Sequence, residues 1–197
     1  MKLSFTSTLI FLFCFILPTI SQANNSTKSQ ASTSGSSTTN FRNTETHKIV
    51  THELIDEICK DATTIVCIVT LSKYIDKPLT TTLSGVMGLA ENQANMTRVK
   101  ISGLYKKTKD KNMKSMYKTC EKNYANAMSQ LHKANKPKVK SVFGHAWEAI
   151  REVKDSCHTS LTHHMSITSS DDLDDLAQDN RKFEDLCAII LAICPAL

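Results

Sequence analysis

Apolar residues recur in steps of three and four along most of the second half of the chain. This is the period of an α-helix that buries one face. The period is clearest in residues 110–134 and 139–157, returns in residues 171–194, and is weaker in residues 83–105. No run shows the strict apolar-polar alternation of a half-buried strand. The pattern therefore predicts four long helices.

Each apolar stripe predicts which side chains its helix buries. The expected core positions are Met87, Ala90, Ala94, Ile101 and Leu104 in the first helix, Met113, Met116, Cys120, Tyr124, Ala127 and Leu131 in the second, Val139, Phe143, Ala146, Ile150, Val153 and Cys157 in the third, and Leu173, Leu176, Phe183, Leu186 or Cys187, Ile190 and Cys194 in the fourth. Pro137 is typical of a helix start. Ser170 is expected to cap the last helix, whose first turns hold four aspartates at the positive end of the helix dipole.

One-sided helices with connections of modest length bury their apolar faces best against each other. The predicted fold is therefore all-α, an up-and-down antiparallel four-helix bundle. Residues 49–74 hold two short apolar runs, and Cys59 and Cys67 lie eight positions apart in them. We expect an N-terminal helical hairpin extension, in which a turn brings the two Cα atoms to the roughly 5.5 Å that a disulfide needs.

The first 23 residues have the pattern of a cleaved signal peptide. Lys2 precedes an apolar stretch, residues 9–20, and Ser21-Gln22-Ala23 supplies small residues at the expected cut. About a dozen apolar residues fall short of the roughly 20 that span a bilayer. We therefore predict secretion to the apoplast or cell wall, with no membrane segment in the mature form, and regard a vacuolar location as less favoured.

The mature chain is expected to hold one folded domain. Residues 24–46 are almost all Asn, Ser, Thr, Gln and Lys, and predict a disordered leader. Residues 47–197 are long enough for a single core. Asn24, Asn25 and Asn95 begin glycosylation sequons, which are acceptor sites for N-linked glycans in a secreted protein.

Six cysteines remain after Cys14 leaves with the signal peptide. An oxidising compartment favours disulfides. Six cysteines can pair in 15 different ways. Cys187 and Cys194 lie about 10 Å apart along a continuous helix, too far to be joined. The simplest pairing is Cys59 with Cys67 inside the hairpin and Cys120 with Cys157 between neighbouring helices. It leaves Cys187 and Cys194 as candidate free thiols, and one such thiol on the surface would link two copies.

Several short motifs occur in one order along the chain. They are Ile55-Asp56-Glu57-Ile58-Cys59, Thr63 or Thr64, Cys67 and Leu71, then the run Cys120 to Ala127 with Leu131, and Trp147 ten residues before Cys157. In this order they resemble the plant invertase and pectin methylesterase inhibitor family over about residues 49–197. The resemblance implies a four-helix bundle with an N-terminal hairpin, the same two disulfides, and often an unpaired cysteine in the last helix.

The resemblance also implies a surface that binds a target enzyme. Invertase inhibitors of the family typically carry Pro-Lys-Phe in the loop before the helix of the fourth cysteine, where this chain has Pro137, Lys138 and Val139. The valine lacks the aromatic ring, and a proline that simply starts a helix is the competing interpretation. Trp147 is more similar to the pectin methylesterase branch, although Glu148-Ala149-Ile150-Arg151 replaces the small residues that follow it there.

No catalytic constellation is recognisable. Gly-x-Ser-x-Gly, a phosphate-binding glycine loop and His-Glu-x-x-His are absent from the sequence. His158, His163 and His164 follow the predicted helix end in a Ser/Thr-rich segment, where we expect solvated histidines rather than a metal site. We therefore predict a protein that is not an enzyme and needs no cofactor.

Charge is distributed unevenly along a chain of formal net charge +5. Residues 98–140 hold thirteen Lys and Arg against two acids, and residues 171–197 hold seven acids against two bases. The basic segment suggests electrostatic adhesion to pectate, or else solvated helix faces that pair with the acidic last helix. Nucleic acid is a poor partner for a secreted protein.

The favoured function is non-covalent inhibition of a plant cell-wall carbohydrate enzyme by occlusion of its active-site cleft. Pectin methylesterase is the favoured target and acid invertase (β-fructofuranosidase) the alternative. A second alternative is a non-inhibitory wall or pollen-type binding protein that has kept the same cysteine scaffold.

Overall fold

The computed structural model describes residues 48–60, 62, 64–134, 139–165 and 170–197, and these residues are almost entirely helical. The sequence predictions for residues 1–47 lie outside this part of the chain. The helical elements are α1 (His52–Cys59), α2 (Thr64–Leu71), η2 (Ser72–Tyr74), α3 (Leu79–Lys107), α4 (Lys111–Ala134), α5 (Val139–Glu152), η3 (Val153–His158), α6 (Thr159–Met165), α7 (Asp171–Ile193) and η4 (Cys194–Ala196). No helix among the described residues is long and apolar enough to cross a membrane.

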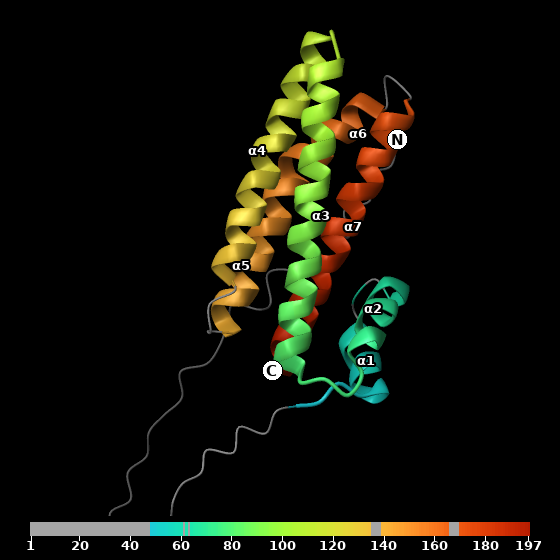
Figure 1. Ribbon diagram of the computed structural model, residues 1–197, viewed down its shortest axis with the longest axis vertical. Coiled ribbons are helices and arrows are strands. Elements are labelled where there is room, and N and C mark those ends of the chain that lie inside the picture. Colours follow the sequence, from blue (N-terminus) through green and yellow to red (C-terminus); the bar gives the residue numbers. More distant parts are fainter. Residues whose placement is uncertain (1–47, 61, 63, 135–138, 166–169) are drawn as a thin grey trace, which may run out of the picture. The chain divides into compact units, whose positions relative to one another are not determined.

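Helices α3, α4, α5 and α7 form the bundle. Helix α3 packs against α4 and α7, and α5 packs against the same two helices, so the four close around one core (Figure 1). Short connections join them in chain order, which makes successive helices antiparallel. The predicted up-and-down four-helix bundle is confirmed.

Side-chain caps fix where several helices begin. Ser170 accepts a hydrogen bond from the backbone N–H of Leu173, as predicted, and Thr51 does the same for Leu54 at the start of α1. At the start of α4, Asp110 accepts from the N–H groups of Asn112 and Met113. These bonds satisfy donors that have no partner inside a helix.

The third bundle helix runs further than predicted. It does not end at Cys157 but passes through the π-helical segment η3 and continues as α6 to Met165. The Thr159 hydroxyl donates to the Lys154 carbonyl oxygen five residues earlier, at 3.2 Å, and the Thr162 hydroxyl donates to that of His158 at 2.8 Å. The Ser/Thr-rich composition suggested a loop. Instead, these two threonine hydroxyls donate hydrogen bonds to backbone carbonyl oxygens of the wide helical turn η3.

The predicted core stripe of α5 is wrong at Phe143, whose side chain is 46% exposed. The buried face is instead Val142, Ala146, Ala149, Val153 and Cys157, also in steps of three and four. The Cys120–Cys157 disulfide holds the Cα atoms of these two residues only 4.6 Å apart, so α4 and η3 lie close together. Helices in such close contact accommodate small side chains between them and turn large ones outward.

A buried polar contact lies at the centre of the bundle. The Tyr124 hydroxyl of α4 donates to Asn180 Oδ1 of α7 at 2.5 Å, and Asn180 Nδ2 donates to Cys157 Sγ at 3.8 Å. Tyr124 and Asn180 have no exposed surface, and burial raises the pKa of the Tyr124 phenol far above its usual value. The phenol ring also meets Phe183 edge to face. One tyrosine thus ties α4, η3 and α7 together.

The N-terminal hairpin is confirmed, with α1 and α2 joined by the Cys59–Cys67 disulfide at a Cα separation of 5.6 Å. Both helices contact α7. Gly85 of α3 allows a further close approach, because a Cβ atom there would clash with the Tyr74 hydroxyl oxygen in η2. The hairpin is therefore packed onto the bundle rather than tethered by the chain alone.

The two disulfides should differ in their contribution to stability. Cys59–Cys67 spans 8 residues and Cys120–Cys157 spans 37, which the loop-entropy model converts to about 2.5 and about 4 kcal/mol. We expect Cys120→Ala/Cys157→Ala to lower the melting temperature more than Cys59→Ala/Cys67→Ala. All four cysteines are almost fully buried, so the two double variants are matched in the volume they remove. Equal shifts would contradict the ranking.

Removing the central hydroxyl should destabilise the bundle. Tyr124→Phe leaves the buried Asn180 Oδ1 without its donor, and we expect a loss of about 1–3 kcal/mol in the free energy of unfolding, measured by urea denaturation. Tyr105→Phe is the control, because Tyr105 is 36% exposed and its hydroxyl can bond to water. Similar losses in the two variants would mean that the buried contact adds nothing.

Candidate functional site

The outer face of α5 presents a line of large side chains to solvent. Phe143 and Trp147 lie one helical turn apart, each with 46% of its surface exposed, and Arg151 follows one turn later. We call these three residues the α5 aromatic face. Burying two aromatic rings in the core would stabilise the fold, so their exposure favours a contact with another molecule.

Arg151 is held in place by its own helix. Its Nε and Nη2 atoms donate to one carboxylate oxygen of Glu148, at 3.0 and 2.6 Å, and this hydrogen bonding raises the pKa of the guanidinium. Arg151 is therefore charged at every physiological pH. The pairing limits the conformations of an arginine whose side chain is 57% exposed.

The residues predicted for target binding are only partly described. Pro137 and Lys138 lie outside the described residues, and Val139 is the first residue of α5. Val139 precedes Phe143 by four residues on α5. Contact of Pro137, Lys138 and Val139 with a target stays a prediction.

The histidines do not lie in a solvated loop as predicted. His158 belongs to η3, and its Nδ1 atom lies 3.1 Å from Glu184 Oε1 of α7. His163 and His164 belong to α6 and meet edge to face. Within the described part of the chain, no three His, Cys, Asp or Glu side chains are arranged to hold a metal ion.

The two remaining cysteines are both buried and unpaired. Cys187 has no exposed surface and Cys194 is 5% exposed, so neither is the surface thiol that would link two copies. Burial raises the pKa of both thiols, that of Cys194 to about 11. Both therefore stay protonated at neutral pH, and a protonated thiol is a poor nucleophile.

Comparison with known proteins identifies the scaffold. The model of the family described as plant invertase/pectin methylesterase inhibitor matches residues 53–193. The chain belongs to the plant invertase/pectin methylesterase inhibitor family. This confirms the resemblance found in the sequence motifs, and a search of curated proteins found no match.

Solved structures show the same fold. A mutant form of a pectin methylesterase inhibitor from Arabidopsis aligns with a TM-score of 0.64 at 19% identity, over 73% of this chain and 96% of that one. A further pectin methylesterase inhibitor structure from Arabidopsis thaliana aligns with a TM-score of 0.54 at 16% identity, over 72% and 95% of the two chains. The chain therefore shares the fold of these inhibitors.

Membership of the plant invertase/pectin methylesterase inhibitor family fits a protein that inhibits enzymes and is not itself an enzyme. It implies a protein partner, a pectin methylesterase or an invertase of the plant cell wall, and family members are typically extracellular. The α5 aromatic face is the best candidate for contact with such a partner. Trp147 was singled out from the sequence, but Phe143 was assigned to the core. The sequence also holds a second stripe through Val142 and Ala149, which is the one that the structure buries and which leaves Phe143 outside.

The raised thiol pKa values predict slow alkylation of the folded protein. With a pKa of about 11 in place of the usual 9, Cys194 has about 100-fold less thiolate at pH 8, and Cys187 still less. We expect iodoacetamide to leave both thiols unmodified in native protein under conditions that label both in denaturant, measured by intact mass. Fast native labelling would contradict the burial of these side chains.

Proposed function

We propose that this protein is a secreted, stoichiometric inhibitor of a plant pectin methylesterase, and that it acts by covering the enzyme's active-site cleft without a covalent step. The proposal rests on the α5 aromatic face of a chain that belongs to an inhibitor family. A rigid bundle presents that face, so little conformational freedom is lost on binding.

The composition of the face suits a binding hot spot. Trp and Arg are the residues most enriched where truncation costs a protein interface most. Trp147 and Phe143 supply apolar area on one rigid helix, and the prearranged Arg151 supplies a cation that can bind carboxylates. Arg151 is 57% exposed and already paired with Glu148, so we assign it to the polar rim of the contact.

Two observations favour pectin methylesterase over invertase. Val139 replaces the phenylalanine of the Pro-Lys-Phe sequence typical of invertase inhibitors, and Trp147 is similar to the pectin methylesterase branch. The two solved structures named above are also pectin methylesterase inhibitors. Acid invertase is the second candidate target. A non-inhibitory wall-binding protein on the same scaffold is the third possibility.

Secretion and glycosylation complete the proposal. The signal sequence in residues 1–23 directs export to the cell wall, where the disulfides persist and the target acts. Of the three sequons, Asn95 lies on an exposed position of α3, whereas Asn24 and Asn25 lie outside the described residues. The basic segment around residues 98–140 would hold the protein to pectate by charge.

Truncation of the α5 aromatic face tests the function directly. The mature protein is titrated against a plant pectin methylesterase and a plant acid invertase in parallel, at mildly acidic pH. We expect near-equimolar inhibition of pectin methylesterase, weakened about 30-fold or more by Trp147→Ala and less by Phe143→Ala. Tyr105→Ala, an exposed aromatic of α3, is the matched control and should change the inhibition constant by less than twofold.

Each outcome identifies one of the three candidates. Inhibition of invertase alone would mean that the protein is an enzyme inhibitor whose target is invertase. No inhibition of either enzyme would favour the non-inhibitory binding protein. Full inhibition by Trp147→Ala would place the contact on another face of the bundle.

A further inference from the structure

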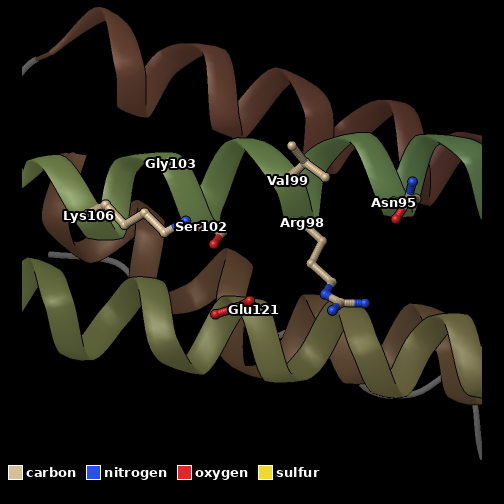
Figure 2. A pocket seen from close by; sticks show the side chains of 7 residues that line it. All are labelled: Asn95, Arg98, Val99, Ser102, Gly103, Lys106 and Glu121. Atoms are coloured by element: carbon tan, nitrogen blue, oxygen red, sulfur yellow. The ribbon is translucent and has the colours of Figure 1, made fainter.

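A groove runs between α3 and α4, and none of its lining residues belongs to the α5 aromatic face. It has a volume of about 390 Å³. The residues that line it are Asn95, Arg98, Val99, Ser102, Gly103, Lys106 and Glu121. In Figure 2, Arg98 extends from α3 toward α4, Lys106 lies along α3 toward Ser102, and Glu121 lies on α4 across from Ser102. We call this the α3–α4 groove.

The surroundings of the α3–α4 groove are strongly basic. Lys118 and Lys122 of α4 are exposed one turn apart, and Lys114 lies 5.7 Å from the centre of the Tyr105 ring on α3. Asp179 of α7 does not neutralise this positive charge, because it pairs at 2.5 Å with Lys100 of α3, which does not line the groove. Glu121 is the one acid among the groove-lining residues, so the positive charge there is only partly offset.

We propose that the α3–α4 groove binds a uronate oligosaccharide, the acidic sugar of pectate. Arg98 and Lys106 would bind two carboxylates of one chain, since a guanidinium and an ammonium are the natural partners of that group. Ser102 and Asn95 would bond to sugar hydroxyls, and the 65% exposed Val99 would contact the apolar face of a ring. The inference extends the proposed function, because pectate is the product that surrounds a pectin methylesterase.

The spacing of the two cations favours a chain of carboxylates over a single small anion. Arg98 and Lys106 are eight residues apart on one helix, about 12 Å along its axis. A chain of carboxylates can reach both cations where they lie, whereas a single phosphate or sulfate would require the two side chains to converge on one point. Lys118 and Lys122 extend the basic surface along α4, so a polymer gains further screened attraction beyond the groove itself.

Glu121 decides between a sugar acid and a plain polyanion. A carboxylate inside a basic groove repels a ligand made only of anions, but it accepts hydrogen bonds from hydroxyl donors. A uronate carries both carboxylates and hydroxyls on every ring, whereas polyglutamate carries no hydroxyl. The groove should therefore bind polygalacturonate more tightly than polyglutamate of equal charge.

The test measures binding of de-esterified oligogalacturonate to the mature protein by calorimetry, at low and at high salt. All proteins are produced in the bacterial periplasm, which forms disulfides but adds no glycan to Asn95. Arg98→Gln/Lys106→Gln should weaken binding about tenfold. The control Arg181→Gln/Lys73→Gln removes the same two charge types from exposed positions of α7 and η2, and should weaken it less than twofold.

A fourth protein, Gly103→Phe, fills the α3–α4 groove without changing any charge. A Cβ atom at Gly103 meets nothing within 4 Å, so the helix accommodates the change, and binding should fall as in the charge variant. No binding by the parent protein, equal losses in the two charge variants, undiminished binding by Gly103→Phe, or equal affinity for polyglutamate would each overturn the proposal. Pectin methylesterase inhibition is measured in parallel and should be unchanged in all variants. A failure of the proposed inhibitory function is then distinguished from a failure of the groove proposal.

Discussion

The Cys120–Cys157 disulfide and the Tyr124–Asn180 hydrogen bond beside it form the contact on which the rest of the bundle depends. The disulfide holds α4 against η3, and the hydrogen bond joins α4 to α7 in a region with no access to water. A buried polar pair is stable only when it is satisfied, so it also fixes the rotation of both helices about their axes. Helix α3 then closes the core against α4 and α7.

Much of this arrangement could be predicted from the sequence. The helical period, the Ser170 cap and the cysteine order predicted the bundle, the hairpin and both disulfides, because each is a local signal or follows from chain spacing. The rotation of α5 could not be predicted. Two stripes, one through Phe143 and Ile150 and the other through Val142 and Ala149, share Ala146, Val153 and Cys157, and only contact with α4 decides between them.

The candidate site was less predictable than the fold for the same reason. An aromatic residue in a helical stripe is normally core, and its exposure becomes visible only once the partner helix is in place. The histidine segment shows a second limit. A π-helical turn at Val153–His158 has no sequence signature, so a run of Ser, Thr and His residues was interpreted as a loop although it continues the helix. The α3–α4 groove forms only where two helices pack together, so the sequence predicted its positive charge but not its shape.

The small side chains on the buried face of α5 separate what stabilises this protein from what it can recognise. Ala146 and Ala149 fill the core, while Phe143 and Trp147 lie on a neighbouring face of the same helix and are each 46% exposed. Substitutions at exposed positions usually change stability by about half a kcal/mol or less. The outer residues of α5 are therefore free to diverge under selection without risk to folding. One scaffold can in this way evolve toward different target enzymes, as a family that contains inhibitors of two unrelated carbohydrate enzymes requires.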